Sequence, residues 1–263
     1  MFHRRQSSFL LILLIAAMAQ SEAFVPLTTA ASSPSSSQSK TALAADVTTD
    51  KSAAPKRKPW NVFRFVEQSS KFINIIPKKA MAGSVGAGVT IWNSQDDAKA
   101  GFTFAPLDDV VMGGASSSTF RNGRWTGEVT DANNGGFIGI RSTPSLELDM
   151  SQCKGLKVTL RGDSIARRMK IGLRDNAEFN GIVWNSSFDV PGGKNNRDVT
   201  IKLPFNKLIP NRFANTVSDA GDFNTSNVAG IQFVYSKFEY EGALNPKFSL
   251  GDIDIEIKKI ESY

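Results

Sequence analysis

The stretch DDVVMGGASSSTF at residues 108–120 combines carboxylates, which bind cations or anchor backbone groups, with glycines that permit close contacts. Asp108 and Asp109 carry oxygens of the kind that accept backbone N–H groups in turns and coordinate Ca²⁺. Gly113 and Gly114 allow positive φ angles and a close approach of the backbone to an anion or a carbonyl. Because two adjacent aspartates lack the D-x-[DN]-x-[DN]-G spacing of a calcium loop, no metal site is predicted.

Two interpretations of this stretch follow from its residues. In the first it is a contact loop for a ligand or partner. In the second it is a corner at the end of a strand, with Met112 in the core and residues 116–118 starting the next strand. We favour the corner, because glycine in or beside a strand usually marks a bulge or a close backbone contact. Asn134, Gly135 and Gly136 pose the same choice, and a hairpin turn is predicted there.

Arginine and tryptophan contribute much of the binding energy when they are exposed at interfaces. Arg141, Arg174 and Trp184 are therefore candidates to face outward on a partner surface, and burial of Trp184 is equally expected. The candidate binding residues, from the loop or from the surface, are Asp108, Asp109, Met112, Gly113, Gly114, Ser116, Asn134, Gly135, Gly136, Arg141, Arg174 and Trp184.

The supply of histidine and cysteine limits the chemistry of the chain. The only histidine, His3, lies in a segment expected to be removed, and Cys153 is the only cysteine. This excludes Ser-His and Cys-His nucleophiles, the usual zinc ligand sets and histidine-based proton transfer in the mature protein. Asp175 and Glu178 would have to act as a pair in an enzyme, but their spacing is more typical of surface charges. The sequence predicts no catalytic residue and no cofactor.

The N-terminal region has the order of two targeting signals. Residues 1–23 contain basic residues, the apolar run from Phe9 to Ala19 and a small-x-small cleavage site, which together are typical of a signal peptide. Residues 24–58, rich in Ser, Thr and Ala, form a transit peptide or a disordered linker that begins with Phe24. This order resembles the bipartite presequences of algae with secondary plastids of the red lineage. It predicts a plastid protein imported through the secretory route, with a mitochondrial or secreted location as the alternative.

The charge of the chain gives no sign of a nucleic-acid partner. The whole sequence has 31 Lys and Arg against 25 Asp and Glu, but seven and three of these lie in residues 1–58. The remaining domain has 24 against 22, a net charge of +2. After the short PKRKP run at residues 55–59, no clustered basic stripe follows.

Hydrophobic periodicity predicts a helix followed by many strands. Apolar residues between Val62 and Ile76 recur at helical spacing up to Pro77, which favours a short amphipathic helix that packs on the following domain. Peripheral membrane contact or partner docking is the functional alternative. From Gly101 onward the period is two, and strands are predicted around residues 125–130, 136–141, 156–160, 169–173, 182–184, 199–203, 231–235 and 253–257.

These elements predict an all-β fold, an antiparallel β-sandwich or jelly roll with a short N-terminal helix. Residues 59–90 are assigned to the helix and a connector, and residues 91–263 to the sandwich. The chain lacks the alternation of strands and helices that a doubly wound fold requires.

Several ordered motifs carry a resemblance to a known family. DDVVMGGASSSTF is followed by GRWTGEV, by NNGGFIGIRS and by CKGLKVTLRGD. This series resembles the complex I intermediate-associated protein 30 family, whose pattern includes D-x-x-M-G-G-x-S-x-S and N-G-G-F. The resemblance covers about Trp92 to Ile260 and departs from the pattern at Cys153, where an aromatic is usual. It implies a galactose-binding-like jelly roll.

The resemblance also implies a function. Members of that family act as assembly factors that bind incompletely assembled complex I, so the expected partners are subunits or assembly intermediates of a membrane electron-transfer complex. A plastid location would make a photosystem the more natural client. Carbohydrate binding is the alternative function, because galactose-binding-like domains also serve as sugar-binding modules.

Overall fold

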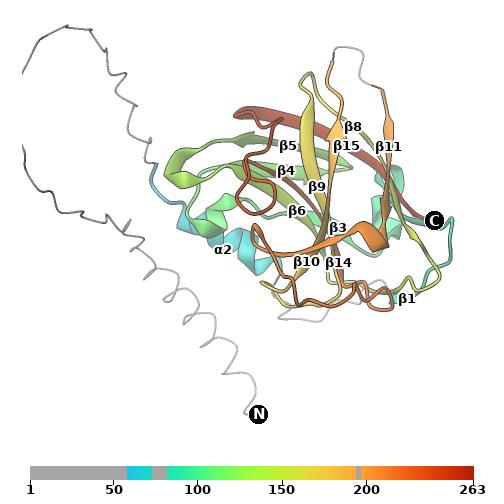
Figure 1. Cartoon of the computed structure of the whole chain (residues 1–263). Coiled ribbons are helices and arrows are strands. Elements are labelled where there is room, and N and C mark those ends of the chain that lie inside the picture. Colours follow the sequence, from blue (N-terminus) through green and yellow to red (C-terminus); the bar gives the residue numbers. More distant parts are fainter. Residues whose placement is uncertain (1–57, 73–81, 194–196) are drawn as a thin grey trace, which may run out of the picture. The chain divides into compact units, whose positions relative to one another are not determined.

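Two antiparallel sheets enclose the core of the protein (Figure 1). The computed structural model describes residues 58–72, 82–193 and 197–263. The targeting signals were expected in residues 1–58, of which 1–57 lie outside the described residues. The helix expected to continue to Ile76 ends at Ser70, with Lys71 as its C-cap.

The larger sheet has seven strands, in the order β13 (Asn215–Thr216), β12 (Ile209–Arg212), β10 (Val183–Val190), β9 (Arg167–Arg174), β14 (Gly230–Ser236), β6 (Phe137–Thr143) and β3 (Thr103–Pro106). The second sheet has six strands, in the order β11 (Val199–Pro204), β8 (Gly155–Arg161), β15 (Gly251–Ser262), β5 (Arg124–Val129) and β4 (Ser117–Arg121), with β2 (Thr90–Asn93) paired to β15. A separate parallel pair joins β1 (Ala82–Ser84) to β7 (Glu147–Asp149).

The alternation in the sequence explains which side of each strand enters the core. In β15, Ile253, Ile255 and Ile257 are buried, while the acidic residues between them face outward. Leu160 of β8 lies opposite Ile257, so the two sides of the ladder bury apolar groups together. Burying a side chain of this size contributes about 1.5–3 kcal/mol. The all-β sandwich that the sequence predicted is confirmed.

Short connecting helices shape the corners between strands. The 3-10 helices are η1 (Ser94–Lys99), η2 (Asp109–Met112), η3 (Ala132–Asn134) and η4 (Phe205–Lys207). The helices η2 and η3 correspond to the two glycine-containing motifs of the sequence. Each motif is therefore a tight turn that leads into a strand, β4 after η2 and β6 after η3. The hairpin turn predicted at Asn134, Gly135 and Gly136 is wrong, because this turn joins β5 of the six-stranded sheet to β6 of the seven-stranded sheet.

The N-terminal helix α2 spans Val62–Ser70 and packs against η2. Its start is capped by Asn61, whose side chain accepts the backbone N–H of Arg64. The packing was expected, but the contacting face is not the apolar one. Gln68 is buried, while Phe63 is 90% exposed. No helix in the described part of the chain combines the length and apolar composition needed to cross a membrane.

Candidate functional site

The carboxylate of Asp108 is fully buried at the beginning of η2 and is surrounded by donors. Its oxygens accept the backbone N–H of Ser118 at 2.7 Å and the Ser118 hydroxyl at 2.6 Å. From α2, the Gln68 side-chain amide donates to Oδ2 at 2.8 Å, and Arg64 Nη2 lies 3.3 Å from the same oxygen. Burial raises the pKa of Asp108, and the bonds from Ser118 and Gln68 oppose that shift. Asp108 therefore joins α2 to β4.

The carboxylate of Asp109 closes the corner itself. Its Oδ1 accepts the backbone N–H of Ser116 at 2.8 Å, and its Oδ2 accepts the Ser116 hydroxyl at 2.7 Å. Oδ2 also accepts the backbone N–H groups of Gly136 at 2.8 Å and Phe137 at 3.3 Å. One buried side chain thus connects the turn before β4 to the start of β6.

The glycines of both motifs make room for this carboxylate. A Cβ at Gly114 would lie 2.3 Å from Asp109 Cγ, and a Cβ at Gly135 would lie 2.4 Å from Asp109 Oδ2. Gly113 ends η2 with a φ of +90°, in the left-handed region that favours glycine. The structure therefore has the stretch as a corner, in which the glycines face a carboxylate of the chain itself.

The corner interpretation expected Met112 in the core. This part of the expectation is wrong, because Met112 is 64% exposed. Val110 is buried in its place. With about three residues per turn in a 3-10 helix, side chains two positions apart point in different directions. Ser116 is buried against Asp109, and Asn134 has a φ of +58° that shapes the turn.

A short N-terminal segment rests on both motifs; residues 58–72 are called the strap below. Asn133 Nδ2 donates to the carbonyls of Lys58 at 2.8 Å and Gly113 at 3.0 Å, and Lys58 N donates to Asn133 Oδ1 at 3.0 Å. Trp60 Nε1 donates to the carbonyl of Val110 at 2.8 Å. The motifs therefore hold the strap as well as the corner, a role that neither interpretation of the sequence included.

Of the three candidates for an outward surface, Arg174 is corrected, and Trp184 takes the buried position that was equally expected. Trp184 is only 4% exposed and packs in the core, with its ring centroid 5.7 Å from that of Phe223. Arg174 is 3% exposed, because residues that follow it, Asn176 and Glu178, cover it and accept bonds from its Nη2. Arg141 is half-buried. These residues form no open contact surface.

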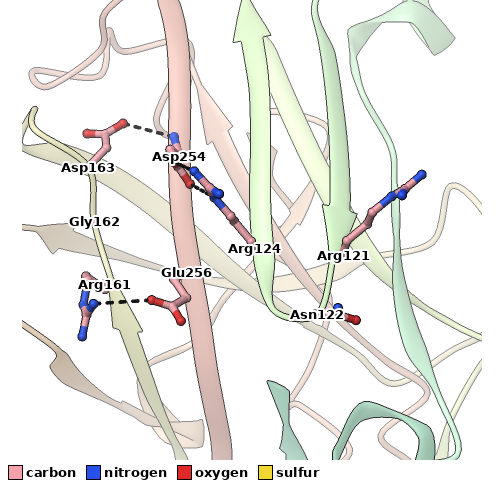
Figure 2. Close-up of a pocket in the computed structure, with 8 residues that line it drawn as sticks. All are labelled: Arg121, Asn122, Arg124, Arg161, Gly162, Asp163, Asp254 and Glu256. Carbon is pink, nitrogen blue, oxygen red and sulfur yellow. Dashed lines mark hydrogen bonds and ion pairs between the residues drawn. The ribbon is translucent and has the colours of Figure 1, made fainter. Parts of the chain in front are cut away.

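A shallow hollow of about 550 Å³ lies on the outer face of the second sheet (Figure 2). Arg124 Nε donates to Asp254 Oδ1 at 2.8 Å, and Arg161 Nη1 lies 3.8 Å from Glu256 Oε2. Three arginines face three carboxylates, so the hollow has no excess of either charge for a ligand to pair with. Its lining residues are Arg121, Asn122, Arg124, Arg161, Gly162, Asp163, Asp254 and Glu256.

Within the described residues, no group of three or more His, Cys, Asp or Glu side chains has an arrangement that could hold a metal ion. The fold and the motif contacts define an antiparallel β-sandwich of the galactose-binding-like class, with a strap held on a buried acidic corner. The chain belongs to the complex I intermediate-associated protein 30 (CIA30) family, whose sequence model matches residues 92–257. That family consists generally of non-catalytic assembly factors, and membership suggests association with complex I intermediates.

Solved structures with a similar fold include carbohydrate-binding modules. The family 11 module from Clostridium thermocellum, in complex with a β-1,3-1,4-mixed-linked tetrasaccharide, is 17% identical, with a TM-score of 0.42 over 67% of this chain and 96% of that one. The family 11 module of the cellulase Lic26A-Cel5E of the same organism is 17% identical, with a TM-score of 0.40 over 69% and 97%. A family 28 module specific for non-crystalline cellulose is 11% identical, with a TM-score of 0.37 over 70% and 99%. No curated protein matches the chain.

Proposed function

We propose that this protein is a non-enzymatic assembly factor that binds intermediates of a membrane electron-transfer complex through the outer face of α2. Family membership supports complex I as the client. The observation that carries the proposal is the apolar side of α2, where Phe63 is 90% exposed and Val62 and Val66 are about half exposed. Exposed apolar groups that gather in one place on a soluble domain mark interaction sites, and aromatic residues contribute most to such contacts.

The way in which α2 is held supports a role in binding. Arg64 and Gln68 occupy the side of the helix that faces Asp108, so the polar residues are used for attachment. The apolar side chains are left on the outer side as a consequence. A helix fixed in this way presents its contact residues without the entropic cost of ordering them on binding.

The apolar side of α2 is also a feature of membrane-surface helices, and the basic Lys71 directly follows the helix. Peripheral membrane contact is therefore the second mode of binding that we propose for it. Sedimentation of the protein with vesicles of organellar lipids tests this mode. Retention of the protein in the supernatant, at every lipid composition, would remove it.

Carbohydrate binding, the alternative expected from the sequence, is not proposed. A sugar-binding surface needs an exposed aromatic platform with polar neighbours. Trp184, the aromatic side chain that the sequence offered for a surface, lies in the core, and Arg174 is covered. The ligands named for the similar solved structures remain properties of those proteins.

The destination of the protein decides its client. The order of signal peptide, Phe24 and hydroxyl-rich segment supports our proposal of a plastid location, where a photosystem would be the client. In mitochondria, the client would be complex I. Affinity purification of the tagged protein from plastid and mitochondrial fractions, with identification of the bound subunits, tests both proposals. Recovery of the protein without subunits of either complex would contradict the assembly role.

A further inference from the structure

Two arginines share the outer face of the seven-stranded sheet near the end of the strap. Arg141 of β6 lies opposite Gln232 of β14, and Arg174 of β9 lies opposite Gly230 of the same strand. Cross-strand partners and residues two apart along a strand point to the same side of a sheet. The two guanidinium groups are therefore on one face, separated by a strand that has a glycine beside Arg174.

The hydrogen-bond partners of these arginines are neutral groups. Arg141 Nε donates to Gln232 Oε1 at 3.1 Å, and Nη1 donates to the carbonyl of Phe179 at 3.3 Å. Its guanidinium lies 5.4 Å from the ring centroids of both Phe72 and Phe179. Arg174 Nη1 is buried and has no hydrogen-bond partner among the residues that the structure describes.

The electrostatic balance of the pair is unfavourable without a further group. Burial, together with the like charge of Arg174, lowers the pKa of Arg141 to about 9. Guanidinium groups nevertheless keep their proton at neutral pH. Among the described residues neither arginine has a carboxylate within ion-pair distance, and burial makes such a charge costly. Asp175 and Glu178 lie close enough to favour the charged form of Arg174, but burial outweighs them and lowers its pKa.

A small pocket of about 30 Å³ lies between the two arginines. On this scale a single water needs about 10–15 Å³, so the pocket has room for two oxygen atoms and is too small for a sugar ring. Gly230 lines the pocket, and a Cβ there would make van der Waals contacts at 3.4 Å with both Arg174 Cδ and Ser142 Oγ, so a methyl group would take up part of the space. The residues around it that matter here are Phe72, Arg141, Ser142, Arg174, Phe179 and Gly230.

We propose that this pocket binds a carboxylate group, held by the guanidinium groups of Arg141 and Arg174. Planar carboxylates match the fork of guanidinium donors. A singly charged group suits the site better than a phosphate dianion, because Asp175 and Glu178 add negative charge nearby. The source of the carboxylate is a small free acid or the C-terminus or acidic side chain of a polypeptide.

Titration of the protein with sodium acetate at constant ionic strength tests this site, with acetamide as the neutral control. The Nε–H resonances of Arg141 and Arg174 in ¹H–¹⁵N spectra are followed, and that of Arg124 on the other sheet is the internal reference. We expect saturable chemical-shift changes of the Arg141 and Arg174 resonances with acetate and no such changes with acetamide. N-acetyl-triglycine and its C-terminal amide form a second arm. Binding of the peptide acid assigns the site to polypeptides, and binding of acetate alone assigns it to small acids.

Gly230→Ala fills part of the pocket and leaves both charges in place. We expect this variant to bind acetate at least about tenfold more weakly, a change of about 1.4 kcal/mol, at an unchanged melting temperature. The proposal is overturned if the shifts do not saturate, if Arg124 shifts equally, or if Gly230→Ala binds as the wild type does. Saturation by phosphate at lower concentration than by acetate overturns the choice of a carboxylate.

Discussion

Replacing Gly114 by alanine changes the acidic corner by a single methyl group. The added Cβ would lie 2.3 Å from Asp109 Cγ and 2.4 Å from Asp109 Oδ1. Real Cβ atoms do not approach other atoms so closely, so the carboxylate has to move. It has little room to do so, because it bonds Ser116 on one side and Gly136 on the other.

The expected cost of Gly114→Ala follows from these contacts. Overpacking in an interior costs about 1–3 kcal/mol, and a hydrogen bond to a charged group contributes about 1.5–3 kcal/mol. If the carboxylate moves away from one donor, the two terms together give about 2.5–6 kcal/mol. The reduced freedom of the unfolded chain returns about 0.4–1 kcal/mol. The net loss of about 3 kcal/mol is a large part of the stability of an ordinary domain.

Urea denaturation of the wild type, Gly114→Ala and the control Gly86→Ala measures this cost. Gly86 has open space around its missing Cβ, so alanine there is expected to leave stability unchanged or slightly higher. In an Asp109→Ala background, Gly114→Ala should cost much less, with a coupling energy of at least about 1.5 kcal/mol. A loss below about 1 kcal/mol for Gly114→Ala, or the same loss in both backgrounds, would refute the reasoning.

Three further outcomes follow from the contacts. Gln68→Ala leaves Asp108 with two bonds fewer and should weaken docking of the strap by about 1–3 kcal/mol; unchanged hydrogen exchange in residues 58–72 would contradict this. Arg124 holds the pKa of Asp254 below 3.8. Asp254→Asn should therefore lower the free energy of unfolding by less than about 1 kcal/mol. This loss of stability should be present above pH 3.8 and vanish as the pH falls through the lowered pKa of Asp254. A loss that grows as the pH falls would contradict the prediction. Burial raises the pKa of Cys153, so alkylation should be slow until the protein is denatured, and equal rates in both states would show an accessible thiol.

The strands were predictable because apolar and polar residues alternate along them, and the apolar residues are on the buried side. Ile253, Ile255 and Ile257 follow this rule, since one sheet face meets the core along the whole strand. The rule gives no signal for the short strands β12 and β13, the last two strands at one end of their sheet, because they have few buried side chains. For these, pairing with a neighbouring strand decides the conformation.

The outward face of α2 was not predictable from its apolar pattern. A buried carboxylate at Asp108 requires donors, and Gln68 and Arg64 supply them from the helix. This polar attachment determines the orientation and leaves Phe63 outside. Arg64 and Gln68 are visible in the sequence as two polar residues four positions apart. Their partner, Asp108, lies 40 residues beyond Gln68, so the sequence pattern does not show the contact. In the same way, Arg174 looked like a surface residue because the loop that covers it is not visible as a pattern.

Comparison of Phe63→Ser with Leu244→Ser tests most directly whether the outer face of α2 binds the client. Both wild-type side chains are large and exposed, at 90% and 67%, so neither substitution should change the melting temperature. The measurement is the amount of client complex that co-purifies with each tagged variant relative to the wild type. The account predicts a loss of at least about tenfold for Phe63→Ser and no change for Leu244→Ser. Equal recovery of the client with Phe63→Ser and the wild type would contradict it.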